Sequence, residues 1–195
     1  MYCQITTKCN MTCEHCCFAC TAKGEDMTLA TFRNAIKFST EYDDIISLGG
    51  GEPTIHPRFW EILGLAMGNF ESVWLATNGK KTEIALALAK MASKGAVACR
   101  LSLDDYHDPI DPRVEAAFDK GNHRHDSREV FDARDISHGA ESIGGQLVNA
   151  GRCDWGMDDC ACPEIFIKPN GDIRICGCDD SPVVGNVNAG GYSDD

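Results

Sequence analysis

Short apolar runs alternate with helical stretches along the first 120 or so residues, and each run ends in a turn of glycine or polar residues. The pattern returns about every 27 residues. It predicts strands at 45–48, 73–76 and 96–103, and helices at 28–40, from residue 57, at 82–94 and at 111–118. Parallel strands need crossover connections of a dozen or more residues, which helices supply. The sequence therefore predicts an α/β fold with parallel strands.

Length limits how much of a barrel the chain can form. A complete (β/α)8 barrel takes about 250 residues, so we expect a partial (β/α) barrel over residues 1–150. Its last strands are expected near 129–133 and 143–148. Cysteines become frequent afterwards, and residues 151–195 are expected to form a small Cys-rich C-terminal module around a β-hairpin. The hairpin is expected at 164–175, because Asn170-Gly171 is a typical turn between two apolar strands.

The chain has 12 cysteines and no segment that resembles a signal peptide, which favours metal binding over disulfides. Cys9, Cys13 and Cys16 lie in one short stretch. Thiolates bind soft metals and iron–sulfur clusters. Three ligands leave one iron of a four-iron cluster open to a further molecule, as in sites that do chemistry. Zinc is the alternative, although zinc favours paired Cys-x2-Cys units and four ligands.

Polar residues follow three of the predicted strands at the point where each strand ends. The first strand ends in Gly49-Gly50-Gly51-Glu52-Pro53, the second in Thr77-Asn78-Gly79 and the third in Asp104-Asp105. Sites in α/β proteins form at the carboxyl ends of the strands, so we expect these residues to share one site. Taken alone, the glycine run is only a turn, and Asn-Gly is a turn signal as well.

These motifs together resemble the radical S-adenosylmethionine (radical SAM) superfamily over about residues 1–120. Cys9-x3-Cys13-x2-Cys16 is similar to its cluster motif, and Gly50-Gly51-Glu52-Pro53 is similar to the GGE motif that holds the cofactor's amino group. His15 stands where the family usually has an aromatic residue that touches the adenine, which is a mild departure. The resemblance implies the following contacts to S-adenosylmethionine (SAM): His15, Gly50, Gly51, Glu52, Pro53, Thr77, Asn78, Ser102 and Asp104.

The resemblance also implies the chemistry. Members of the superfamily bind SAM at the open iron of a [4Fe-4S] cluster, cleave it reductively to a 5′-deoxyadenosyl radical and abstract hydrogen from a substrate. The implied cluster ligands are Cys9, Cys13 and Cys16. The candidate substrate contacts, which closely follow the third strand, are Tyr106, His107 and Asp108.

The C-terminal cysteines resemble the twitch or SPASM module that many members of this superfamily carry. Cys160, ten residues, Gly171, four residues and Cys176 match its pattern. The resemblance implies an auxiliary [4Fe-4S] cluster, so that the expected cofactors are two [4Fe-4S] clusters and SAM. Its expected ligands are Cys153, Cys160, Cys176 and Cys178, with Cys162 as a substitute. A zinc site built from Cys-x-Cys pairs is the alternative.

We therefore expect a radical SAM enzyme, and the resemblance favours modification of a peptide or protein. The alternatives are radical modification or rearrangement of a small molecule or a modified nucleobase or nucleoside, a glycyl-radical activase, and a non-enzymatic iron–sulfur or zinc protein. The implied partner is a flavodoxin- or ferredoxin-like electron donor. A net charge of −12 disfavours binding to nucleic-acid backbones. No apolar run approaches the ~20 residues of a membrane span, and we expect a cytoplasmic protein.

Overall fold

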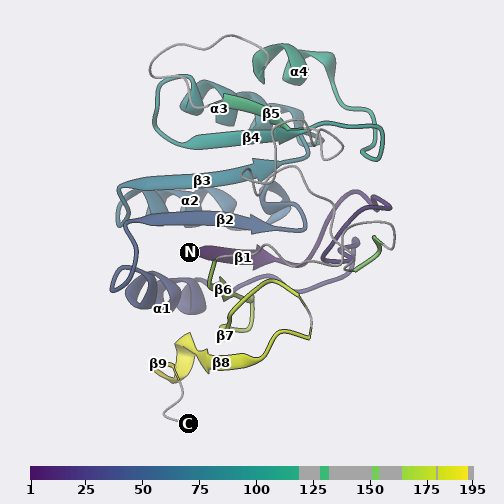
Figure 1. The fold of residues 1–195 in the computed structure, drawn as a ribbon. Coiled ribbons are helices and arrows are strands. Elements are labelled where there is room, and N and C mark those ends of the chain that lie inside the picture. The colour runs from purple at the N-terminus through teal and green to yellow at the C-terminus, as the bar shows by residue number, and fades with distance from the viewer. Residues whose placement is uncertain (119–127, 132–150, 154–163, 179, 193–195) are drawn as a thin grey trace.

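A computed structural model describes residues 1–118, 128–131, 151–153, 164–178 and 180–192. The strands in these residues form one sheet in the order β5-β4-β3-β2-β1-β6-β7-β8-β9 (Figure 1). They are β1 (Tyr2–Thr6), β2 (Ile45–Gly50), β3 (Ser72–Thr77), β4 (Ala98–Ser102), β5 (Arg128–Phe131), β6 (Phe166–Ile167), β7 (Asp172–Arg174), β8 (Val183–Asn186) and β9 (Gly191–Tyr192). Neighbours from β5 to β6 are parallel, and those from β6 to β9 are antiparallel.

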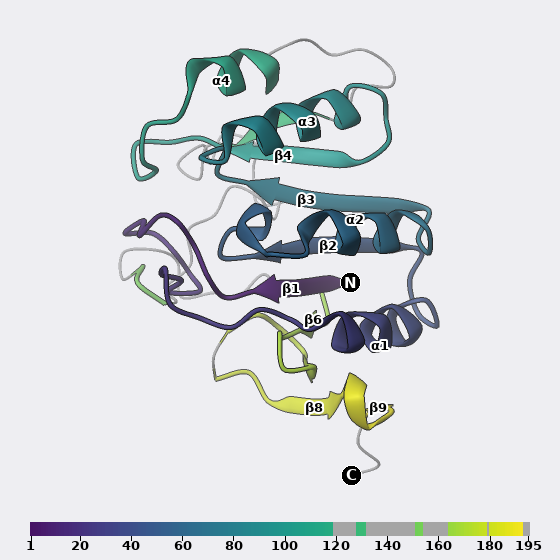
Figure 2. The ribbon, with the colours of Figure 1, turned by 180° about the vertical axis from the view of Figure 1, so that it is seen from behind.

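Helices connect the parallel strands and cover one face of the sheet. They are α1 (Leu29–Ser39), α2 (Phe59–Met67), α3 (Thr82–Ala92) and α4 (Pro112–Phe118), with short 3-10 helices η1 (Pro53–Ile55) and η2 (Val187–Ala189). The strands lie in front of α2 and α3 in Figure 1, and these helices lie in front of the strands in Figure 2, which shows the molecule from behind. The predicted α/β alternation is therefore confirmed. No helix in the described residues is long and apolar enough to cross a membrane.

The helix ends follow from local sequence signals. Thr28 caps α1, because its hydroxyl accepts a hydrogen bond from the Thr31 N–H at 3.1 Å. After α3, Gly95 adopts the left-handed conformation with φ 70°. The Gly95 N–H then donates to Ala92 and the next N–H donates to Met91, which closes the helix.

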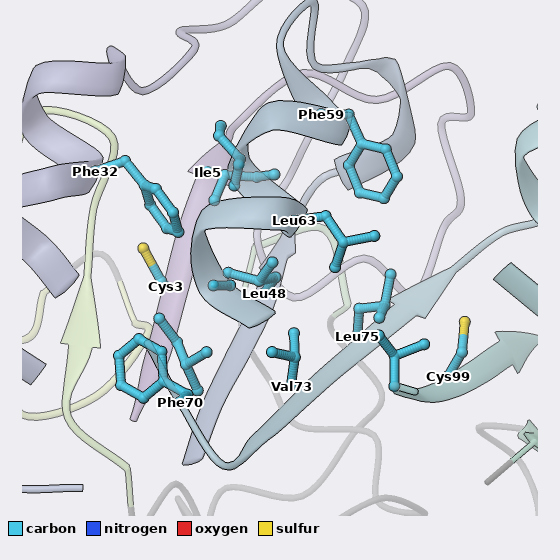
Figure 3. Packing of buried hydrophobic residues seen from close by; sticks show 14 of the residues in the cluster. Cys3, Ile5, Phe32, Leu48, Phe59, Leu63, Phe70, Val73, Leu75 and Cys99 are labelled. Carbon is cyan, nitrogen blue, oxygen red and sulfur yellow. The ribbon is translucent and has the colours of Figure 1, made fainter. Parts of the chain in front are cut away.

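Alternate strand residues point into an apolar core beneath the helices. Cys3 of β1, Leu75 of β3 and Cys99 of β4 pack in one cluster with Phe32 of α1 and Leu63 of α2 (Figure 3). Cys3 is 0% and Cys99 is 2% exposed. Burial raises the pKa of both thiols, which keeps them protonated at neutral pH. These two cysteines therefore act as small apolar core residues.

The C-terminal strands continue the same sheet. Strand β6 pairs in parallel with β1, with Tyr2 opposite Phe166, and β6 and β7 form a hairpin whose turn contains Gly171 at φ 94°. The sheet thus spans both of the segments expected as separate modules. Its edge strands are β5 and β9, so the described strands form an open sheet, and the partial barrel stays a prediction. The strand expected at 143–148 lies outside the described residues.

Candidate functional site

The three motif cysteines lie in a loop that leaves β1 and returns beside it. Thr6 forms a β-bridge with Asp26, and the Thr6 hydroxyl donates to the Asp26 carboxylate at 2.7 Å. Farther along, the Cys9 N–H donates to the carbonyl of Thr21 at 2.7 Å. Within this closed loop Cys9 is buried, while Cys13 and Cys16 are partly exposed, and none of the three forms a disulfide. These hydrogen bonds therefore close a loop that carries three thiols free of disulfides.

Cys20 acts on Cys16 as a hydrogen-bond donor. The Cys20 thiol hydrogen-bonds the Cys16 side chain, and this bond lowers the pKa of Cys16 well below the ordinary value of a thiol. The same bond raises the pKa of Cys20, which stays protonated. In contrast, burial raises the pKa of Cys13 to about 11. The hydrogen bond from Cys20 therefore favours the thiolate form of Cys16, which is the form that binds metal.

The donors of this loop are three thiols from one short stretch of chain. In an iron–sulfur cluster each thiolate binds a different iron, whereas a structural zinc site takes four ligands. Among the described residues, the group whose three ligand atoms lie within 4.8 Å of one another is His15, Asp104 and His107. The donor set in the loop therefore fits an iron–sulfur cluster.

Glu52, after β2, is a buried carboxylate with 1% exposure. Its Oε1 accepts hydrogen bonds from the Thr54 N–H at 3.1 Å, the Thr54 hydroxyl at 2.6 Å and the Thr77 hydroxyl at 2.9 Å, and its Oε2 accepts one from the Asn78 N–H at 2.7 Å. Burial raises the pKa of Glu52, and these hydrogen bonds oppose the rise. No Lys, Arg or His among the described residues forms an ion pair with it. An ammonium group on a ligand would supply the missing cation.

The neighbouring glycines are required by β1 and its loop. A Cβ at Gly50 would lie 2.3 Å from the carbonyl oxygen of Thr6, and a Cβ at Gly51 would lie 2.3 Å from that of Lys8. The Gly51 N–H donates to Thr6 and the Glu52 N–H donates to Lys8, both at 2.9 Å. These contacts fix the GGE turn against the start of the cysteine loop.

Asn78 links the end of β3 to the cysteine loop. Its Nδ2 donates to Asn10 Oδ1 at 2.9 Å and lies 3.7 Å from Cys9 Sγ. Its Oδ1 accepts from the Lys80 N–H, and Lys80 Nζ donates to the Asn10 carbonyl at 3.0 Å. Since the Asn78 N–H also binds Glu52, one residue joins the cysteine loop to the ends of two strands.

Asp104, after β4, lies between two histidines. Its Oδ1 is 2.7 Å from His107 Nδ1 and accepts from the Tyr106 N–H at 2.9 Å, and its Oδ2 is 3.7 Å from Nε2 of His15 in the cysteine loop. The His15 ring centroid lies 4.9 Å from that of Tyr106 and 5.0 Å from that of His107. Burial raises the pKa of Asp104, but the hydrogen bond and attraction from His107 outweigh it and bring the pKa to about 2. The predicted cofactor contacts His15 and Asp104 thus lie beside the predicted substrate contacts Tyr106 and His107.

The other predicted contacts lie near these groups in the sequence. Asp108 forms an ion pair with Lys80, whose Nζ also reaches the cysteine loop. Pro53 is buried and begins η1 directly after Glu52. Ser102 is the last residue of β4 and pairs with β5.

Three of the five C-terminal cysteines belong to the described residues. Cys153 is 4% exposed, and Cys176 and Cys178 are partly exposed. All three are free of disulfides. Cys160 and Cys162 lie outside the described residues, so the auxiliary ligand set stays a prediction.

Tyr2 is a residue of the site that the motifs did not indicate. Its ring stacks on Phe166 with 4.4 Å between centroids, and a Cβ at Gly49 would lie 1.8 Å from its hydroxyl oxygen. The phenol therefore covers Gly49, the residue directly before the GGE motif. Alternation along β1 places Tyr2 on the face opposite Cys3, but its contact with β2 depends on the register between strands, which no local signal reveals.

Comparison with known proteins identifies relatives of part of the chain. Residues 3–135 match the model described as the Radical SAM superfamily. The chain is 30% identical over 118 residues to mycofactocin maturase MftC of Mycobacterium ulcerans (strain Agy99), covering 58% of this chain and 31% of the relative. It is also 30% identical over 105 residues to MftC of Mycobacterium tuberculosis (strain CDC 1551 / Oshkosh), covering 52% and 26%. The match thus spans less than a third of either relative.

Solved structures share the fold over most of the chain. BtrN in complex with AdoMet and 2-DOIA gives a TM-score of 0.63 at 15% identity and covers 96% of this chain and 77% of its own. Native anSMEcpe with bound AdoMet and Cp18Cys peptide gives 0.59 at 14% identity, covering 95% and 76%. At this identity the likeness is one of fold.

Proposed function

This chain belongs to the radical SAM superfamily, and we propose that it is a peptide- or protein-modifying member with its cofactors at the carboxyl ends of β1 to β4. Membership makes the chain an enzyme that uses a [4Fe-4S] cluster and SAM. The proposal concerns which residues hold these groups and which substrate faces them.

The observation that carries the proposal is the buried carboxylate of Glu52. It has four hydrogen-bond donors and no cationic partner among the described residues, and Asn78 connects it to Cys9 Sγ. A buried charge is costly unless it is paired. SAM carries a positive charge at its sulfonium, and its amino group would offer N–H donors to this carboxylate when the amine nitrogen binds the open iron. An electron carrier or a zinc-binding module has no need of such a group.

The remaining roles follow from position around Glu52. Cys9, Cys13 and Cys16 are the proposed cluster ligands. When bound, the cluster and SAM supply one-electron cleavage of the sulfonium and hydrogen abstraction, with the electron coming from a flavodoxin- or ferredoxin-like donor. The proposed SAM contacts are His15, Gly50, Gly51, Glu52, Pro53, Thr77, Asn78, Ser102 and Asp104.

The substrate is proposed to meet the helix-free face of the sheet and the loop after β4. Gln4 lies on this face by alternation from Cys3 and is 1% exposed, and its Oε1 has no hydrogen-bond partner in the described part of the chain. An amide N–H of a peptide would satisfy this acceptor. Tyr106, His107 and Asp108 are the proposed contacts from the loop. The relatives named as maturases and the neighbour solved with a bound peptide support this substrate class.

An auxiliary [4Fe-4S] cluster is proposed at the C-terminal cysteines. Its proposed ligands are Cys153, Cys160, Cys176 and Cys178, with Cys162 as a substitute. The β6–β7 hairpin beside β1 supports the proposal, because it brings this segment into the same sheet as the first cluster loop.

Anaerobic reconstitution followed by iron and sulfide counting tests the cofactor assignment. We expect about eight irons per chain, as in two four-iron clusters. A Cys153→Ala, Cys176→Ala double variant should retain about half of them. Loss of all iron from this variant would contradict the two-site proposal. About four irons and one zinc in the wild-type chain would favour a zinc site at the C-terminal cysteines.

A further inference from the structure

Residues 151–153 pass directly over the cysteine loop, although more than 130 residues separate Arg152 from the last motif cysteine. Gly151 has φ 62°, and a Cβ there would lie 2.5 Å from the carbonyl oxygens of both Cys16 and Cys17. Glycine is needed at this position for its backbone conformation and for the close approach. The chain is therefore built to bring its next residue, Arg152, against the loop.

Arg152 makes three hydrogen bonds to backbone carbonyls of the cysteine loop. Its N–H donates to Cys16 at 3.0 Å, its Nε to Cys13 at 2.9 Å and its Nη1 to Cys20 at 2.8 Å. The three carbonyls span the part of the loop that carries two motif cysteines. One residue thus fixes the loop from a distant part of the sequence, with two side-chain hydrogen bonds and one from the backbone.

One donor of the Arg152 guanidinium is left without a protein acceptor among the described residues. This donor is Nη2, which is buried and has no hydrogen-bond partner in the part of the chain that the structure describes. Among the described residues, no Asp or Glu forms an ion pair with Arg152. A buried donor on a positive group without an anion costs free energy unless a ligand satisfies it.

Arg152 binds the loop at its cysteines, because Nε and Nη1 donate to the carbonyls of Cys13 and Cys20 and the backbone N–H donates to that of Cys16. Thiolate and sulfide sulfur atoms accept hydrogen bonds, and such bonds raise the reduction potential of a cluster. The sulfur atoms of an iron–sulfur cluster in this loop are therefore suitable acceptors for Nη2.

We propose that Arg152 is a positioning residue for the first cluster: it clamps the cysteine loop through three carbonyls, and its Nη2 donates to a sulfur of the cluster and raises its reduction potential. The inference rests on the proposed cluster at Cys9, Cys13 and Cys16. Reduction adds negative charge to the cluster, so a nearby cation with an N–H donor favours the reduced form.

The test compares full-length reconstituted chains that all carry Cys176→Ala and Cys178→Ala, so that the first cluster alone is observed. The measurements are a redox titration followed by electron paramagnetic resonance and the rate of iron loss to a chelator. Arg152→Gln should give a more negative potential and about tenfold faster iron loss. Arg152→Lys should keep the potential near that of the parent, because it keeps the charge, and should still lose iron faster.

The matched control is Arg58→Gln, which removes an exposed arginine that pairs with Glu61 on the surface. It should leave both measurements unchanged. An Arg152→Gln chain with the parent's potential would overturn the inference while leaving the cluster assignment intact. A parent chain that binds no iron would overturn both. If Arg152→Gln takes up no cluster, the test depends on Arg152→Lys. A folded Arg152→Lys chain with the parent's rate of iron loss would contradict the clamp. Loss of folding in both variants would also contradict it, because Arg152 would then be needed for the fold alone.

Discussion

Glu52→Gln removes the negative charge of the buried carboxylate and keeps its shape. The three donors to Oε1 come from Thr54 and Thr77 and can bind the glutamine carbonyl equally well. The amide NH2 replaces Oε2, so the Asn78 N–H loses its acceptor. The substitution therefore tests the charge that we assign to SAM binding, and it leaves the cysteine loop intact.

The expected losses of SAM affinity and of stability follow from the interactions that Glu52→Gln removes. Loss of one partner from a buried charge pair costs about 2–5 kcal/mol, so SAM should bind about 30-fold more weakly or worse. The unpaired Asn78 N–H costs the fold about 1–3 kcal/mol, and removal of a buried, unpaired charge offsets part of this. For a chain of this size the melting temperature should change by less than about 10 °C. Cofactor binding should thus suffer far more than stability.

Isothermal titration calorimetry of SAM into the reconstituted protein, without oxygen, gives the dissociation constant. Glu61→Gln is the matched control, because it makes the same chemical change at an exposed carboxylate of α2. Iron content should equal that of the wild type in both variants. A Glu52→Gln protein that binds SAM within threefold of the wild type would refute the assigned role of Glu52.

Three further predictions concern the site's framework. Cys20→Ala should raise the pKa of Cys16, so alkylation of Cys16 in the metal-free protein at pH 6 should slow down. An unchanged rate would contradict the hydrogen bond from Cys20 to Cys16. Gly51→Ala should cost about 1–3 kcal/mol and lower the melting temperature by about 2–12 °C. Gly64→Ala should not lower it, because an added Cβ there would have no described atom within 4 Å. Because the pKa of Asp104 is lowered, its stabilisation should be present above about pH 4 and lost as the pH falls towards 2. Urea unfolding of Asp104→Asn and the wild type should therefore differ less at pH 3 than at pH 7.

Local patterns were sufficient to predict the α/β part of the fold. The apolar run at 45–48 and the helical spacing at 82–94 correspond to β2 and α3 with boundaries shifted by at most a few residues. Placement of Glu52, Asn78 and Asp104 at strand ends also predicted that they would converge, because parallel strands share one carboxyl edge. The structure links all three to the cysteine loop.

Contacts between distant segments could not be predicted in the same way. The pairing of β6 with β1, the phenol of Tyr2 over Gly49 and the clamp of Arg152 on Cys13 depend on register and on long-range packing. The packing around the GGE motif is a further example: the missing side chains of its glycines make room for the backbone of β1 and its loop. The contacts of these glycines with the cofactor stay a prediction.

Release of 5′-deoxyadenosine tests the central claim most directly. The wild-type chain is reconstituted anaerobically, reduced with dithionite and incubated with SAM, and the nucleoside is quantified by mass spectrometry. We expect the reduced wild-type protein to form 5′-deoxyadenosine and Cys16→Ala, which lacks one of the three loop ligands, to form none. A fully reduced, iron-loaded wild-type protein that forms none would contradict the assignment of the chain as a radical SAM enzyme.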